Sequence, residues 1–185
     1  LKVNVTPVND APTRVETDPV ELYAINEDVS SASNSGETLK NLLYKTGQSR
    51  FDDSKDTVFG GTSANKFQGI LIVGYTEDSS KGQWEYSTNN GSTWTTINDC
   101  SLNDALLLNN PDVKLRFEPT LDYNGEPPSL NVRLVEDGTA NSWTQTLGAS
   151  CVLRGDFSAA TATGGASAIS NASNQLTVKI TVQEV

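Results

Sequence analysis

Alternation of apolar and polar residues, interrupted by short turns, is the feature that most limits what this chain can fold into. The chain closes with LTVKITVQEV, in which every second residue of 176–182 is apolar. A period of two predicts a β-strand with one buried face. The pattern recurs at 113–117 and 130–134, and 82–97 predicts a hairpin, because Asn90-Gly91 supplies the positive φ of a tight turn. These segments predict an all-β protein with at least seven short strands.

Other segments add weaker predictions. Residues 67–76 are an apolar run bounded by glycines and predict a buried strand, and a further strand is expected within 19–28. Leucines at helical spacing predict short helices within 36–45 and 101–110, the second with Ser and Asp placed as in a capping box. The small-residue tract 155–174 is expected to be an irregular loop or a weak strand pair.

The two ends of the chain have the same character. LKVNVTP at the start alternates as the last ten residues do, and both ends predict one strand of the same type. If the last strand is aligned with the first so that Val185 matches Val8, an Asn-Asp-Ala-Pro of the kind found at 9–12 would follow Val185. We therefore expect one repeat of a tandem array, with 1–13 as the end strand and linker of the preceding repeat and 14–185 as a single domain.

Charge and composition argue against several functional classes. Asp and Glu outnumber Lys and Arg by 23 to 13, and the formal charge of −10 would repel nucleic acid. The chain has no His, which removes the usual general base, the usual zinc ligand and the Ser-His and Cys-His nucleophile pairs. No apolar run approaches the roughly 20 residues of a membrane span, and no signal peptide is visible. We expect a secreted binding protein without membrane insertion, and not an enzyme.

The chain has two cysteines, Cys100 and Cys151. A disulfide between them would close a loop of about 50 residues and contribute about 3 to 4 kcal/mol in the chain-entropy model. Two unpaired buried thiols are the alternative, because sequence does not show whether the two residues approach each other. Neither is expected to be catalytic, since no His is present to activate it.

Four stretches, in order along the chain, resemble the cadherin-like repeats of giant bacterial RTX adhesins: VNDAPT at 8–13, GQWEYSTNNGSTW at 82–94, LLLNNPDVKLRFEPTLDYNG at 106–125 and LTVKITVQEV at 176–185. The resemblance implies a cadherin/immunoglobulin-like antiparallel β-sandwich elaborated by long loops and one or two short helices. It also implies a calcium-loaded, secreted protein of the cell surface that contacts neighbouring repeats of the same polypeptide. VEDGTANSW at 135–143 departs from the pattern, as do the two cysteines.

Length distinguishes this chain from a plain spacer, because a sandwich repeat of that kind needs only about 100 residues. The extra length makes the chain most similar to the calcium-dependent peptide-binding domain of such adhesins. The resemblance then implies a surface adhesion module that binds an extracellular peptide or protein C-terminus on a target cell. The alternatives are a spacer that calcium rigidifies, a calcium-dependent lectin and, last, a glycosidase with paired carboxylates.

Calcium takes six to eight oxygen ligands, and acidic loop segments supply them. By analogy with cadherins, we expect Asp10 with Glu27 or Asp28 to form one cation site at the domain entrance. No EF-hand loop is present. Any one acidic cluster taken alone also fits a solvated surface. The metal-ligand candidates are Asp10, Glu27, Asp28, Asp52, Asp53, Asp56, Asp122, Asn124, Glu136 and Asp137.

An open position on a bound calcium ion would accept a ligand carboxylate, and a glycine-rich loop would hold the second oxygen. Each aromatic candidate for such a site also fits the core. Arg154-Gly155-Asp156 matches an integrin-binding motif, but so short a match arises often by chance, and an ordinary loop carboxylate or calcium ligand is the preferred interpretation of Asp156. The candidate ligand-binding residues are Asp122, Tyr123, Asn124, Asp137, Trp143 and Asp156.

Overall fold

The computed structural model describes residues 8–45, 49–56, 64–137, 150–159 and 163–185, and these form a β-rich fold with little helix. The strands are β1 Thr13–Arg14, β2 Val20–Glu21, β3 Ile25–Asn26, β4 Glu37–Thr38, β5 Phe51–Asp52, β6 Phe67–Gly74, β7 Gly82–Ser87, β8 Thr95–Thr96, β9 Ala105–Leu108, β10 Lys114–Pro119, β11 Leu130–Glu136, β12 Val152–Gly155, β13 Leu176–Lys179 and β14 Val182–Gln183. The helical segments are α1 Leu39–Leu43 and the 3-10 turns η2 Ser54–Asp56 and η3 Ala172–Asn174. Within these ranges no helix has the length and apolar character needed to span a membrane.

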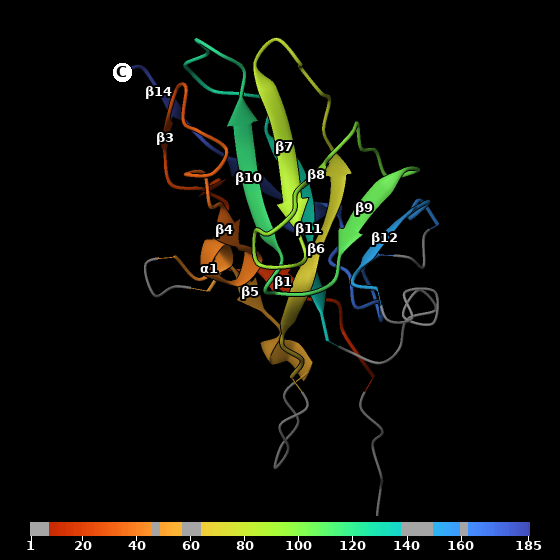
Figure 1. Cartoon of the computed structure of the whole chain (residues 1–185). Helices are drawn as coiled ribbons and strands as arrows, with labels where there is room; N and C mark the ends of the chain where they lie inside the picture. Colours follow the sequence, from red (N-terminus) through yellow and green to blue (C-terminus); the bar gives the residue numbers. More distant parts are fainter. Residues whose placement is uncertain (1–7, 46–48, 57–63, 138–149, 160–162) are drawn as a thin grey trace, which may run out of the picture.

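Two sheets form the body of the fold (Figure 1). One has four strands in the order β4-β10-β7-β8, and the other has six in the order β12-β9-β6-β11-β13-β2. The pairs β1-β5 and β14-β3 make two further small sheets. The predicted all-β class is confirmed.

The main core takes side chains from both sheets. Trp84 of β7 and Phe117 of β10 meet edge to face, with ring centroids 5.6 Å apart. They join Ile72 of β6 and Leu134 of β11 in one buried cluster. The Trp84 indole donates a hydrogen bond of 2.7 Å to the carbonyl of Pro128, so its buried polar atom is satisfied.

A charged network lies buried on the four-stranded sheet. The Arg116 side chain of β10 is 4% exposed, and its Nη2 lies 2.7 Å from Glu85 Oε2 of β7. Its Nη1 donates to the carbonyls of Ser31 at 2.8 Å and Asn34 at 3.0 Å. Its guanidinium lies 4.2 Å from the centroid of the Trp94 ring. Arg116 thus fastens the loop before β4 to the sheet.

The predicted hairpin and the predicted strands at 67–76, 113–117, 130–134 and the C-terminus are present as β7-β8, β6, β10, β11 and β13-β14. The helix predicted within 36–45 is present as α1, whose first turn is capped by the Thr38 hydroxyl, which accepts from the Asn41 amide. The strand expected at 1–5 lies outside the described residues.

The helix predicted within 101–110 is wrong, because strand β9 lies there. β9 is hydrogen-bonded to β6 on one side and β12 on the other. Leu106 and Leu108 enter the main core, while Ala105 and Leu107 enter a second, smaller core. A strand buried on both faces is apolar throughout, so its periodicity does not distinguish it from a buried helix.

The purely antiparallel pairing implied by the family resemblance also needs correction. β13 pairs with β2, and β14 with β3, in parallel. The strand expected within 19–28 is split into β2 and β3, and these run alongside the closing segment of the chain in the same direction (Figure 1). A non-local pairing of this kind has no signal in either segment alone.

The tract 155–174 has no extended strand pair where it is described, as the loop alternative predicted. It covers one side of the six-stranded sheet, since Phe157 and Ile169 pack with Leu71, Leu107 and Val135 in the second core. The two cysteines are free thiols, Cys100 buried and Cys151 half-buried. Burial raises the pKa of the Cys100 thiol, which keeps it protonated.

Replacing Arg116 with Ala should destabilise the fold strongly. The substitution leaves Glu85, whose side chain is 10% exposed, without its cation, and breaking such a buried pair costs about 3 to 5 kcal/mol. Lys81→Ala is the control, because it breaks a half-exposed ion pair with Asp78 and should leave the free energy of unfolding nearly unchanged. Urea unfolding followed by tryptophan fluorescence measures both, and equal losses would contradict the structural role of Arg116.

Candidate functional site

The segment before β1 is bound to the domain through a cluster of polar side chains at one end of the sandwich. The Asp10 amide donates to both carboxylate oxygens of Asp56, at 2.9 and 3.2 Å. The neighbouring elements η2 and the end of β11 meet at the lower end of the molecule in Figure 1. We name this set the entrance cluster and define it as Asn9, Asp53, Asp56, Asn65 and Glu136.

Hydrogen bonds join four separate segments within the entrance cluster. Asn9 Nδ2 donates to Glu136 Oε1 at 2.6 Å, and Asn65 Nδ2 donates to Asn9 Oδ1 at 2.7 Å. The Asn65 amide donates to Asp53 Oδ2 at 2.6 Å. The linker, the turn after β5, the residues before β6 and the end of β11 are therefore held together by amide groups that bond to carboxylates and to one another.

Two carboxyl groups at the centre of the cluster are removed from water. Glu136 is 1% exposed and Asp53 is 6% exposed, and the two lie within hydrogen-bonding reach of each other. Asp53 Oδ1 and Glu136 Oε2 are buried and receive no hydrogen bond. Burial, together with the neighbouring Asp53 carboxyl group, raises the pKa of Glu136 to about 8. Burial also raises the pKa of Asp53.

The repulsion between two buried carboxylates can be removed in two ways: the pair shares a proton, or it binds a cation. Within the described ranges no three His, Cys, Asp or Glu side chains stand together as a finished metal-binding group. Calcium also accepts amide and carbonyl oxygens, and it needs six to eight oxygens in all. Asp53 and Glu136 would supply the charge and Asn9 a neutral oxygen, and these are donor types that calcium accepts.

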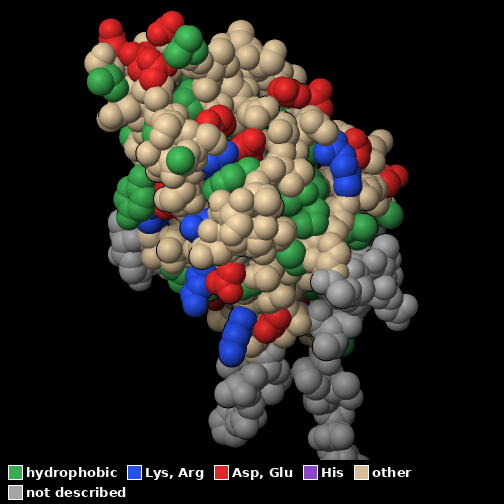
Figure 2. All heavy atoms as spheres, in the orientation of Figure 1, with side chains coloured by type: hydrophobic (Ala, Val, Ile, Leu, Met, Phe, Trp, Pro, Cys, Tyr) green, Lys and Arg blue, Asp and Glu red, His purple; other side chains and the backbone are tan. Residues whose placement is uncertain are grey.

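A second acidic cluster lies at the other end of the sandwich. We name it the exit cluster and define it as Glu27, Asp28, Asp122 and Asn124. The Asp122 amide donates to Asp28 Oδ1 at 3.0 Å, and Asn124 Nδ2 donates to Glu27 Oε2 at 3.0 Å. Asp28 and Asp122 have φ of 59° and 60°, a left-handed conformation that short polar side chains tolerate. Figure 2 shows acidic side chains gathered at this upper end, where the β10–β11 loop and the C-terminus lie in Figure 1.

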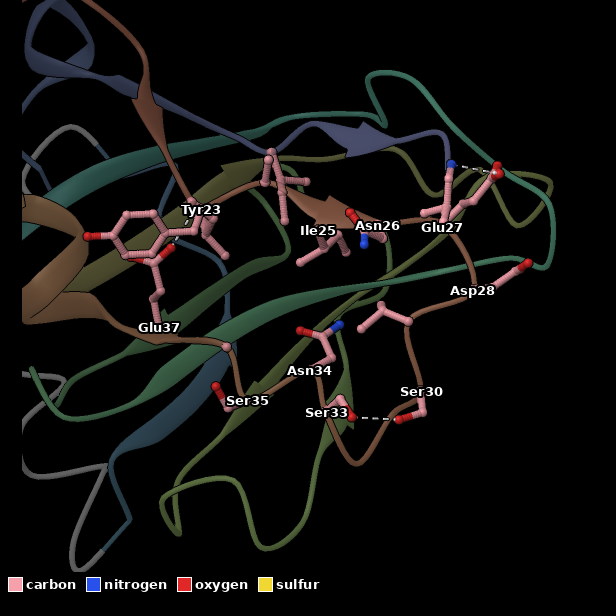
Figure 3. A pocket seen from close by; sticks show the side chains of 16 residues that line it. Tyr23, Ile25, Asn26, Glu27, Asp28, Ser30, Ser33, Asn34, Ser35 and Glu37 are labelled. Atoms are coloured by element: carbon pink, nitrogen blue, oxygen red, sulfur yellow. Dashed lines mark hydrogen bonds between the residues drawn. The ribbon is translucent and has the colours of Figure 1, made fainter.

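A groove of about 770 Å³ runs from the exit cluster along β3. It lies between β3 and the loop that folds back from Asp28 toward Glu37 (Figure 3). Leu22, Ile25 and Ile180 give it apolar walls. Glu27 and Asp28 stand at one end of the groove, and Tyr23 and Glu37 stand at the other (Figure 3).

The predicted pairing of Asp10 with Glu27 or Asp28 is not found. Asp10 bonds to Asp56 at the entrance, whereas Glu27 and Asp28 bond to Asn124 and to Asp122 at the exit. The physical reason is that β2 and β3 carry the chain the length of the sandwich, from the linker at one end to residue 27 at the other (Figure 1). The ten metal-ligand candidates thus divide between two ends.

Two of the other acidic candidates have local structural roles. The Asp52 carboxylate accepts hydrogen bonds from the amide and hydroxyl of Ser54, which begins η2. Asp137 Oδ1 accepts from the Lys66 amide at 2.8 Å, and the Asp137 amide donates back to Lys66. Both residues therefore lie next to the entrance cluster in the sequence, but their carboxylates bond to Ser54 and to the Lys66 backbone.

The six ligand-binding candidates do not form one pocket. Asp122 and Asn124 belong to the exit cluster, while Tyr123 packs against the main core. Asp137 follows Glu136 of the entrance cluster and bonds to the Lys66 amide, and Trp143 lies outside the described residues. Asp156 is exposed and accepts from the Ser158 amide.

The integrin-like motif lies on an edge strand and not on a loop tip. Arg154 belongs to β12, and its Nε and Nη2 donate to the two oxygens of Asp104, at 2.7 and 2.8 Å. The guanidinium of the motif is therefore engaged within the domain. This geometry agrees with the interpretation of Asp156 as an ordinary loop carboxylate.

Asn65 is the cluster residue that sequence reasoning missed. It is neutral, and nothing in its local pattern indicates a ligand, except that it lies just before a predicted strand. The groove along β3 was also not predicted, and the sequence carries little indication of it. Its walls come from short elements and from a loop that Arg116 fixes through distant contacts.

The pH dependence of stability tests the buried pair. In chelator, folded Glu136 keeps its proton up to a pKa of about 8, against 4.5 in the unfolded chain, so the native state binds more protons between these values. Stability should therefore fall as pH rises through this window, by up to about 1.4 kcal/mol per pH unit. Thermal unfolding from pH 5 to 8.5 measures this.

The variant Glu136→Gln should remove most of that slope and be more stable than the parent at pH 8 in chelator. Glu77→Gln, at an exposed position, is the matched control and should keep the parental slope. A parental slope in Glu136→Gln would show that another group titrates.

Comparison with protein-family models, with curated proteins and with solved structures finds no match for this chain.

Proposed function

We propose that this chain is a calcium-binding β-sandwich module of a secreted, cell-surface adhesion protein, and that it binds extracellular peptides. The observation that carries the calcium proposal is the buried carboxyl pair of Asp53 and Glu136, with one oxygen on each lacking a hydrogen bond. Two buried carboxylates without a cation are strongly unfavourable, because each has lost its hydration. A divalent cation at this position neutralises both.

Calcium binding at the entrance cluster would have two consequences, the release of a proton and the stiffening of the segment before β1. The ion would take the place of the shared proton, so binding releases a proton at pH below about 8. The ion would also bind the side-chain oxygen of Asn9, which precedes β1, and would thereby stiffen the segment that leads into the domain. This is the mechanical role expected of a module in a chain of domains.

A binding role fits the site better than catalysis does. A glycosidase needs its two carboxyl groups open to a sugar, about 5 to 10 Å apart. Asp53 and Glu136 are instead buried and in contact. The absence of His from the sequence supports the same proposal.

Peptide binding is favoured by the groove beside β3. The amides of Ile25 and Glu27 donate to the carbonyls of Thr181, just before β14, and of Gln183 in β14. The amide of Asn26, between them, therefore points to the other side, where the groove lies, while its carbonyl accepts a hydrogen bond of 3.4 Å from the Val29 amide. An extended peptide would add to this edge and place apolar side chains against Leu22 and Ile25. Calcium at the exit cluster would then receive the peptide carboxylate.

Calcium should raise the melting temperature of the protein at pH 7, and Asp53→Asn should abolish most of that rise. The substitution removes one of the two buried charges that the ion neutralises. Asp112→Asn, at an exposed turn, is the matched control and should respond as the parent does. Differential scanning calorimetry in millimolar calcium and in chelator decides, and an equal response in the two variants would contradict the entrance site.

Peptides with a free C-terminus should bind in calcium, whereas amidated peptides and assays in chelator should show little binding. Glu27→Gln with Asp28→Asn should weaken binding by about tenfold or more, since a charge-assisted contact is lost. The control is Asp53→Asn, which alters the other end of the molecule. A peptide library read by fluorescence polarisation tests this, and binding that is indifferent to calcium would refute the carboxylate-to-calcium contact.

A further inference from the structure

A second hollow, of about 620 Å³, adjoins the groove at the end where Tyr23 and Glu37 lie. Its walls include Lys40 of α1, Lys45 just after that helix, and Lys114 of β10. We name it the lysine hollow. Three lysines against one glutamate make it locally positive on a chain whose formal charge is −10.

Two of these lysines have no internal counterion. Among the described residues Lys45, Lys81 and Lys179 form ion pairs, but Lys40 and Lys114 form none. Every Asp and Glu of the chain lies within the described ranges, so no carboxylate elsewhere in the sequence remains to pair with them. In a protein with 23 acidic and 13 basic residues, two lysines in the lining of one hollow that lack an ion-pair partner are available to an external anion.

Aromatic rings border the same hollow. Tyr23 is 70% exposed and Tyr44 is 40% exposed. Lys45 Nζ lies 3.7 Å from the centroid of the Tyr23 ring and 3.0 Å from Glu37 Oε2. Tyr44 is braced by an edge contact with Phe67, at 6.4 Å between centroids. Both rings are thus held in place while part of each remains open to solvent.

We propose that the lysine hollow is a binding site for an acidic sugar, whose carboxylate pairs with Lys40 and Lys114 and whose apolar ring face packs on Tyr23 and Tyr44. A sugar ring has an apolar face and a polar rim, which is the combination that tyrosines beside hydrogen-bonding side chains accommodate. Thr38 and Asn41 in the lining offer partners for its hydroxyl groups.

The floor of the hollow disfavours an acidic peptide as the occupant. It is formed by the start of α1, whose backbone amides are already bonded. The Lys40 amide donates to the carbonyl of Pro111, and the Asn41 amide donates to the Thr38 hydroxyl. A strand-like peptide would find no free backbone edge there, in contrast to the groove beside β3.

The experiment is titration calorimetry of the whole chain with an oligogalacturonate, compared with a neutral glucose oligomer of the same length. Both are measured in chelator, so that calcium takes no part and the outcome is separate from the proposed calcium and peptide functions. We expect the acidic oligomer to bind at least about tenfold more tightly than the neutral one, with an affinity that falls as salt rises.

Matched variants locate the site. Lys40→Gln with Lys114→Gln should weaken binding by about tenfold or more, and Tyr23→Ala should weaken it as well. Lys81→Gln with Lys179→Gln changes the net charge equally at paired surface positions and should keep the affinity within about twofold.

Three outcomes would overturn the proposal. The first is no binding of the acidic oligomer by the parent protein. The second is an equal loss in both double variants, which would mean that net charge alone is responsible. The third is equal binding of an oligoglutamate peptide with the same dependence on Lys40 and Lys114, which would make the site a general anion site and not a sugar site.

Discussion

The contact between the buried carboxyl groups of Asp53 and Glu136 is the constraint on which the entrance of this domain depends. It joins the turn after β5 to the end of β11, and Asn9 and Asn65 bring the linker and the start of β6 to the same place. Without a proton or a cation the pair would repel, and these segments would be pushed apart. The identity of that positive charge therefore determines both the stability of the domain and its attachment to the preceding segment.

The opposite end depends on a different buried charge. Arg116 is satisfied entirely by the protein, through Glu85, two backbone carbonyls and the Trp94 ring. This network holds the loop that walls the groove, so the groove is formed before any ligand arrives. The two networks have opposite chemistry, because the anionic pair at the entrance lacks a partner whereas Arg116 has several. That contrast is why we assign cation binding to the entrance and a structural role to Arg116.

Sequence periodicity predicted the elements that have one buried face. The hairpin at 82–97 and the strands at 113–117 and 130–134 alternate clearly, and each was found. The strand at residues 105–108 was wrongly predicted as a helix, because a strand buried on both faces shows no alternation. The site was predicted in part: both acidic sets were named, but Asp10 was joined to Glu27 or Asp28, since sequence does not show which loops share an end of a sandwich. Asn65 and the parallel pairing of β3 are long-range consequences of packing that no local pattern encodes.

Calcium binding at the entrance cluster is tested most directly by a crystal structure of the protein grown in calcium, with anomalous scattering from a lanthanide exchanged into the same site. We expect an anomalous peak between Asp53 and Glu136, within about 2.3 to 2.6 Å of Asp53 Oδ1 and Glu136 Oε2. A direct contact between the two carboxyl groups, with no peak between them at neutral pH in millimolar calcium, would contradict it and leave a shared proton as the stabilising charge.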